Sequence, residues 1–198
     1  LPNGTYRIAC YNDASYGLDV NGLSTADEAN VMINQYNGGQ NQQFNVTFSG
    51  DHYNIQAVHS GKYLDLYQAK SAPGTNVQQY TIDGTDVQNW VLEEAGEGAY
   101  YIINNNGLYM DVQDGAIGNG VNVQGYTGNQ SNAQKWFFVA VNETAKIPDG
   151  DYQIRLASNY SYGVVEETGK ATSGSNVHLW TVDDNSANHK WHVTYLGD

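Results

Sequence analysis

The sequence is poor in cysteine, in positive charge and in long apolar runs. Its single cysteine, Cys10, excludes a disulfide within the chain. Only 8 of the 198 residues are lysine or arginine, and the formal net charge is −13. A surface that neutralises phosphates is therefore missing, which argues against nucleic acid and anionic membranes as partners. No apolar run approaches the length of a membrane-spanning helix, so we expect no membrane insertion.

Helical periodicity is also missing almost everywhere. Short apolar or alternating runs stand in its place, for example at residues 6–10, 53–58 and 100–103. Turn-forming pairs such as Asn37-Gly38 and Asp83-Gly84 separate these runs. The pattern predicts an all-β protein built from short strands.

A block of about 46 residues is written three times in the chain. The residues that recur at this interval are an aspartate, an Asn-Val pair and the aromatic residue of a Gln-x-aromatic triplet. They are Asp19, Asp65 and Asp111, then residues 30–31, 76–77 and 122–123, and finally Phe44, Trp90 and Trp136. Such a period indicates one small unit that is stacked until a shared core is covered. Each block contains about four of the short runs, which predicts about twelve strands in the three blocks.

A fourth block begins at residue 147 and matches the first block better than its neighbours. Residues 1–8 reappear as residues 147–154, and Tyr16-Gly17 reappears as Tyr162-Gly163. The polar segment that precedes the fourth block contains Pro148 and interrupts the 46-residue rhythm. We therefore predict three parts, a first domain at 1–142, a linker at 143–149, and at 150–198 the first repeat of a second, incomplete set.

The recurring aspartate and the closing triplet, which is Gln-x-Trp in two blocks, resemble those of the ricin B-type β-trefoil lectins. These proteins are also grouped as family-13 carbohydrate-binding modules. The resemblance covers nearly the whole chain, and several of its elements recur in register. It implies an all-β fold, in which three repeats of about 46 residues form a β-trefoil and the fourth repeat begins a second trefoil. It also implies non-catalytic carbohydrate binding, and tandem trefoils of this kind are typical of bacterial proteins.

In that family each repeat can carry a shallow sugar pocket. The aspartate accepts hydrogen bonds from two adjacent sugar hydroxyls, and an aromatic side chain 15 residues later stacks on the apolar face of the sugar. Amide side chains complete the contacts. The resemblance therefore implies binding residues in the second and third repeats, namely Asp65, Gln78, Tyr80, Gln88, Asp111, Gln124, Tyr126, Asn132 and Gln134.

The repeats depart from the family pattern in two ways. The residue before the closing glutamine, often asparagine in the family, is Val87 in the second repeat and Ala133 in the third, where Asn132 could substitute. The first repeat has an asparagine where the stacking ring belongs, and in the fourth Val165 replaces the aspartate. The first repeat is therefore a weaker candidate, with Asp19, Asn41 and Gln42 as its residues, and the fourth is weaker still.

No set of residues suitable for catalysis or metal binding stands out. His189 and His192 lie three apart on a predicted strand and so point to opposite faces. A glycosidase needs two carboxyl groups within about 5–10 Å of each other, whereas Asp65 and Asp111 would lie on separate lobes of a trefoil. Cys10 lies in a predicted strand and is expected in the core. We expect no enzymatic activity and no cofactor.

The expected ligands are neutral glycans of the galactose, xylose or arabinose type. Two other functions stay open: an interaction or scaffold role in a toxin or cell-surface complex, and targeting of a larger glycoside hydrolase or peptidase. The lack of disulfides favours a cytosolic or bacterial origin, and the resemblance favours an extracellular, bacterial protein. Apolar residues in the fourth repeat need cover, so we expect further domains after residue 198, packing on the first domain, or self-association.

Overall fold

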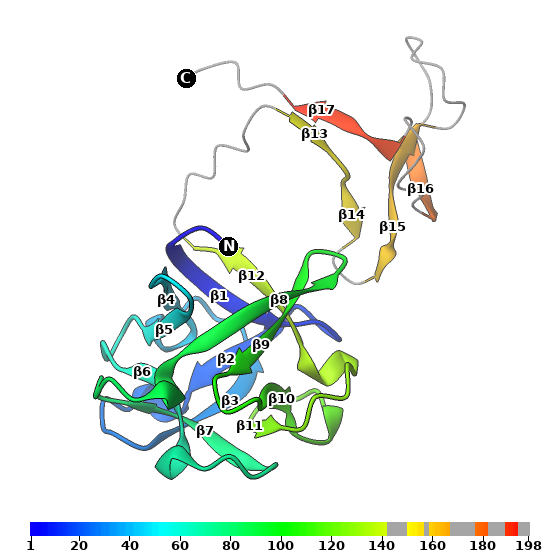
Figure 1. The fold of residues 1–198 in the computed structure, drawn as a ribbon. Helices are drawn as coiled ribbons and strands as arrows, with labels where there is room; N and C mark the ends of the chain where they lie inside the picture. Colours follow the sequence, from blue (N-terminus) through cyan, green and yellow to red (C-terminus); the bar gives the residue numbers. More distant parts are fainter. Residues whose placement is uncertain (142–149, 157–158, 167–176, 182–188, 194–198) are drawn as a thin grey trace. The chain divides into compact units, whose positions relative to one another are not determined.

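The chain is described by a computed structural model, shown in Figure 1. The structure describes residues 1–141, 150–156, 159–166, 177–181 and 189–193. By its internal contacts the chain divides into two units, Leu1–Asn142 and Glu143–Asp198, which we describe separately. The linker predicted at 143–149 lies outside the described residues. Within the described part, no helix has the length and apolar character needed to cross a membrane.

The first unit contains twelve short strands, four in each repeat, which confirms the predicted all-β fold. The first repeat holds β1 (Gly4–Cys10), β2 (Tyr16–Val20), β3 (Ala29–Gln35) and β4 (Phe44–Phe48). The second holds β5 (Tyr53–Ala57), β6 (Tyr63–Leu66), β7 (Thr75–Tyr80) and β8 (Trp90–Gly96). The third holds β9 (Ala99–Asn104), β10 (Tyr109–Val112), β11 (Val121–Tyr126) and β12 (Lys135–Ala140).

The first and fourth strands of the repeats form a closed antiparallel ring, in the order β1, β4, β5, β8, β9, β12 and back to β1 (Figure 1). The second and third strands form three hairpins, β2–β3, β6–β7 and β10–β11. These hairpins also pair with one another, because β3, β7 and β11 contact each other in a triangle. A closed ring with a triangular cap of hairpins is a β-trefoil, and closure leaves the ring without an open edge.

Three asparagines join the repeats at the centre of this cap. The Nδ2 of Asn30 donates to Oδ1 of Asn122 at 3.0 Å, that of Asn122 donates to Asn76 at 3.0 Å, and that of Asn76 donates to Asn30 at 2.8 Å. The three amides thus form a closed cycle in which each side chain both donates and accepts. This cycle explains why asparagine recurs every 46 residues. The valine that follows each asparagine, at 31, 77 and 123, is fully buried in the core.

The closing aromatic residues fill the same core. Phe44, Trp90 and Trp136 are completely buried. The indole Nε1 of Trp90 donates to the carbonyl of Leu64 at 3.1 Å, and that of Trp136 donates to the carbonyl of Met110 at 2.9 Å. Each tryptophan thereby fixes the strand that carries the aspartate of its repeat, because the carbonyl belongs to the residue just before it.

Cys10 also lies in the core, as predicted, and is only 2 % exposed. Burial, reinforced by the charge of Asp13, raises the pKa of its thiol to about 12. A thiol with this pKa stays protonated at neutral pH, so Cys10 is a packing residue rather than a nucleophile.

The second unit contains the strands of one repeat. They are β13 (Gly150–Tyr152), β14 (Arg155–Leu156), β15 (Asn159–Glu166), β16 (Val177–Thr181) and β17 (Trp191–Val193). In it Tyr152 pairs with Trp191, as Tyr6 pairs with Phe44 in the first repeat. The indole of Trp191 donates to the carbonyl of Val164 at 2.8 Å, as the two core tryptophans of the first unit do to theirs. The described strands of this unit therefore follow the pairing scheme of a trefoil repeat.

Candidate functional site

Each repeat of the first unit places its aspartate near the end of its second strand. Asp19 lies on β2, Asp65 on β6 and Asp111 on β10, and all three are at most 5 % exposed. The neighbouring strand brings a glutamine directly opposite two of them, since Asp65 pairs with Gln78 and Asp111 with Gln124. Strand register therefore creates an acid–amide pair on one side of each of these two hairpins.

The pair in the third repeat is completed by the closing glutamine. The Nε2 of Gln124 donates to Oδ1 of Asp111 at 3.0 Å, and the Nε2 of Gln134 donates to Oδ2 at 3.1 Å. Gln134 also donates to the carbonyl of Thr127 at 2.9 Å and accepts a hydrogen bond from the backbone N–H of Asn129 at 2.9 Å. Gln134 therefore fixes both the carboxylate and the loop that borders it.

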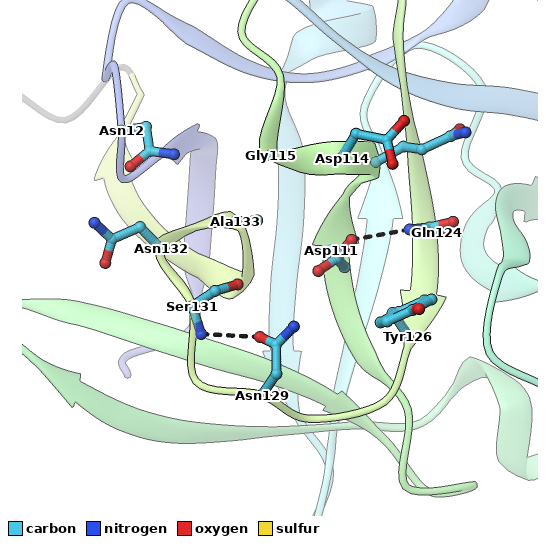
Figure 2. A pocket seen from close by; sticks show the side chains of 11 residues that line it. Asn12, Asp111, Asp114, Gly115, Gln124, Tyr126, Asn129, Ser131, Asn132 and Ala133 are labelled. Carbon is cyan, nitrogen blue, oxygen red and sulfur yellow. Dashed lines mark hydrogen bonds between the residues drawn. The ribbon is translucent and has the colours of Figure 1, made fainter.

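An open cavity of about 570 Å³ lies over Asp111. Figure 2 shows Tyr126 beside the Asp111–Gln124 pair, and the tyrosine is 40 % exposed. Asn132 lines the cavity too, but its amide is turned away from Asp111 (Figure 2), and the described hydrogen bonds do not join the two side chains. The lining residues are Asn12, Asp111, Gln113, Asp114, Gly115, Gln124, Tyr126, Asn129, Ser131, Asn132 and Ala133.

Opposing effects act on the pKa of the Asp111 carboxyl group. Burial raises its pKa, the hydrogen bonds from Gln124 and Gln134 oppose this effect, and the charge of Asp114 adds to the increase. A partly desolvated carboxylate is stabilised by any further hydrogen-bond donor that reaches it. Asp111 is thus a fixed acceptor at the base of an open cavity.

The second repeat carries a smaller version of this arrangement. The Nε2 of Gln78 donates to Oδ1 of Asp65 at 2.9 Å. Gln88 is buried as well, and it donates to the carbonyl of Thr81 at 3.0 Å and accepts from the backbone N–H of Asp83 at 3.1 Å. The cavity over Asp65 measures about 230 Å³. Its lining residues are Glu28, Asp65, Gln68, Ala69, Gln78, Tyr80, Asp83, Thr85 and Val87.

The pKa of Asp65 is raised from its ordinary value of 3.8 to about 6. Burial is the largest cause, hydrogen bonds from Gln78 and Gln88 act in the opposite direction, and the charges of Asp83 and Asp27 raise it further. Like-charged neighbours disfavour the ionised carboxylate, and donors favour it. The second pocket therefore has more negative charge around it than Asp65 alone would supply.

The first repeat has the aspartate without the rest of the pocket. Asn41 donates to one oxygen of Asp19 at 3.0 Å, and Gln42 donates to the other at 2.9 Å. Met32, not an amide, pairs with Asp19 on β3. Asn34, which stands where the other repeats have tyrosine, accepts a hydrogen bond from the backbone N–H of Gly120 at 2.8 Å. This candidate therefore has no aromatic wall.

The fourth repeat lacks the acceptor altogether. Val165, at the position of the aspartate, is 2 % exposed and pairs with His178 on β16. Elsewhere in the described residues, no group of three or more His, Cys, Asp or Glu side chains could hold a metal ion.

Glu28 is a pocket residue that sequence reasoning missed. It precedes β3 of the first repeat but lines the cavity of the second repeat. Residues 28, 74 and 120 are equivalent by the 46-residue interval, and all three have positive φ, at 64°, 86° and 80°. Gly74 lies close to Gln124 in the same way, since a Cβ there would meet its Oε1 at 3.9 Å. The sequence signal that could have identified this residue is the glutamate at position 28, since the equivalent positions 74 and 120 are glycine.

The ring of strands agrees with what comparison of the sequence shows. The family model for ricin-type β-trefoil lectin-like domains matches residues 1–80, 40–126 and 86–180. The chain belongs to this family. No curated protein matches the sequence.

Three solved structures resemble the chain over about 70 % of its length. A designed three-fold symmetric protein, ThreeFoil, is 35 % identical, with a TM-score of 0.67 over 70 % of this chain and 100 % of its own. An exo-β-1,3-galactanase from Clostridium thermocellum is 27 % identical, with a TM-score of 0.67 over 71 % of this chain and 31 % of its own. A ricin B-like lectin from Macrolepiota procera, solved with lactose, is 21 % identical, with a TM-score of 0.61 over 71 % of this chain and 99 % of its own.

Proposed function

We propose that this ricin-type trefoil is a non-catalytic carbohydrate-binding domain that uses the pockets of its second and third repeats. The observation that carries the proposal is the pocket over Asp111. There a buried carboxylate, held by Gln124 and Gln134, lies at the base of an open cavity beside the exposed ring of Tyr126.

The chemistry of this pocket suits a sugar ring. The two glutamine amides hold Asp111 in place but leave lone pairs on both carboxylate oxygens, which adjacent sugar hydroxyls can use. Tyr126 offers a flat apolar face to the C–H groups of the sugar. A few fixed polar groups beside an aromatic wall orient a small ligand, and here they favour a neutral glycan.

Among neutral sugars, the similar solved structures favour those of the galactose type. The trefoil from Macrolepiota procera was solved with lactose, and the enzyme from Clostridium thermocellum is a galactanase. Xylose-type and arabinose-type sugars fit the same combination of carboxylate and ring. Single pockets of this shallow kind bind with dissociation constants of roughly 0.1–1 mM. Two pockets on one body would bind a polymer more tightly through effective concentration.

Targeting of an attached enzyme is the second candidate function. The galactanase supports it, because the chain matches only about a third of that protein. In this role the trefoil would hold a catalytic domain on an extracellular glycan and would hydrolyse nothing itself.

The decisive experiment uses the chain with Asp65→Ala and Asp111→Ala together. On columns of immobilised lactose and of galactan, xylan and arabinan, we expect the parent chain to be retained on at least one and the double variant to pass through. Asp51→Ala is the matched control, since the Asp51 side chain is 92 % exposed and is not among the residues that line either cavity. Thermal melting should show that the double variant is folded. Full retention of the double variant, or passage of the parent on every column, would contradict the proposal.

A further inference from the structure

The two candidate pockets differ in charge at equivalent positions. Where the second pocket has Glu28, the third has Gly74, and where the second has Asp83, the third has Asn129. Both differences place an additional carboxylate in the second pocket, whereas Asp114 of the third pocket is replaced by Gln68 in the second. Together with Asp65, three carboxylates line a cavity of only about 230 Å³.

The second pocket also contains a buried acceptor that has no donor. Gln78 is 2 % exposed, and its Nε2 donates to Asp65, but its Oε1 has no hydrogen-bond partner among the residues that the structure describes. An acceptor buried without a donor costs free energy, which a ligand that supplies a donor can recover. Neither lysine nor arginine is among the described residues that line this cavity.

The two lysines nearest to Asp65 in sequence, Lys62 and Lys70, are engaged elsewhere, and Lys70 lies over the ring of Tyr67. Lys62 donates to Oδ1 of Asp27 at 2.7 Å and to Oγ1 of Thr81 at 2.7 Å. The carboxyl of Asp65 therefore meets like charges, and burial together with Asp83 and Asp27 raises its pKa. A cation bound in the pocket would relieve this repulsion, whereas an anionic sugar would increase it.

Building on the proposed function, we propose that the second-repeat pocket selects sugars that carry a free, protonated amino group, while the third-repeat pocket takes neutral sugars. The ammonium group would lie among Glu28, Asp65 and Asp83, and the sugar ring would stack on Tyr80. The small cavity suits a single sugar ring, because pockets for drug-sized ligands measure roughly 300–1,000 Å³. An N-acetylated sugar loses the charge and adds bulk, so it should be discriminated against.

The test isolates the second pocket with Asp111→Ala and compares galactosamine with galactose and N-acetylgalactosamine, all as methyl glycosides. Binding is followed at pH 7 by NMR titration. We expect galactosamine to bind about tenfold more tightly than either of the other two sugars, since charged hydrogen bonds are stronger than neutral ones. The preference should shrink as salt is added, because screening weakens attraction at a partly open site.

A charge-converting variant gives the second pocket the residues of the third pocket at positions 28 and 83. Glu28→Gly suits the left-handed backbone that Gly74 already adopts, and Asp83→Asn can keep the hydrogen bond from the N–H of Thr85, as Asn129 does from Ser131. In this variant the ratio of the galactosamine to the galactose affinity should fall to about one. The exposed substitution Asp51→Asn should leave the ratio unchanged.

The outcomes separate this inference from the proposed function. Equal affinities for galactosamine and galactose in the isolated pocket would overturn the inference and leave the proposed function standing. A ratio that the charge-converting variant does not change would have the same meaning. Binding of sugars by the parent chain but not by the Asp111→Ala variant would overturn the inference and would also remove the second pocket from the proposed function, leaving the third. If the parent chain binds none of these sugars and is not retained on any glycan column, both fail.

Discussion

The first and third repeats share one backbone but differ in what surrounds their aspartate. In the first, Asn41 and Gln42 donate to the carboxylate of Asp19. Asn34, which takes the place of the tyrosine, accepts a hydrogen bond from the backbone N–H of Gly120. In the third, Ala133 replaces the amide at position 41, and an open cavity and a tyrosine stand in front of Asp111. The comparison teaches that the aspartate alone has a structural role, and that the open space and the ring make it a candidate binding residue.

Single substitutions of the three aspartates should give the largest contrast. Asp111→Ala should remove one binding site and lower affinity there at least tenfold, because it deletes the charged acceptor. Asp65→Ala should remove the other site, and Asp19→Ala should remove none. Counting sites by NMR titration with the retained glycan checks this. Loss of a sugar site in Asp19→Ala would contradict the contrast between the first and third repeats.

The core offers a second contrast, since Phe44 in the first repeat takes the place of the tryptophans in the others. Trp136→Phe should lower the free energy of unfolding by about 1–3 kcal/mol, because it removes the hydrogen bond to Met110 and leaves a void. Urea denaturation measures this change. The exposed substitution Phe48→Leu is the control and should have little effect. A stability loss below the error of the measurement would show that the bond to Met110 contributes nothing.

Removal of the ring should have a smaller effect on binding than removal of the carboxylate. With the second pocket disabled by Asp65→Ala, Tyr126→Ala should weaken sugar binding about five- to tenfold, since stacking contributes about 1 kcal/mol. Asn34→Ala, at the matching position of the first repeat, should leave binding as it was. Titration of both variants with the same sugar decides the matter, and equal affinities would mean that Tyr126 is not part of the site.

The smallest effect concerns the pH dependence that Asp65 gives to the second repeat. Since the pKa of Asp65 is about 6 in the folded protein against an ordinary value of 3.8, the folded state holds this proton more tightly than the unfolded chain. The contribution of Asp65 to the free energy of unfolding should therefore be largest below pH 4 and fall as the pH rises from about 4 to about 6.

Two measurements test this expectation. Asp65→Asn should flatten the decline in stability over that pH range, while Asp19→Asn serves as the comparison in the first repeat. Affinity of the second pocket for a neutral sugar should fall as the pH drops below about 6, because protonation removes the charged acceptor. A second pocket with the same affinity at pH 5 and pH 7 would contradict the assignment of Asp65 as its acceptor.

Much of this protein was written in its sequence. The 46-residue interval predicted three repeats of four strands, because equivalent residues must meet around a common core. The interval identified the recurring aspartates, and the resemblance to the lectin family added Gln78 and Tyr80 to Asp65, and Gln124 and Tyr126 to Asp111; the structure places these residues at two cavities. These pairs were predictable because strand register places residues of fixed spacing opposite one another.

Only the tertiary structure decided what lies between the repeats. Glu28 belongs to the first repeat by sequence, yet the pairing of β3 with β7 carries it to the pocket of the second. Asn132 shares a cavity with Asp111 but does not bond to it, and no spacing rule could have shown the direction of its amide. The cycle of Asn30, Asn76 and Asn122 likewise needs three hairpins to meet. A repeat period determines which residues are equivalent, whereas contacts between repeats depend on how closed strands bring distant segments together.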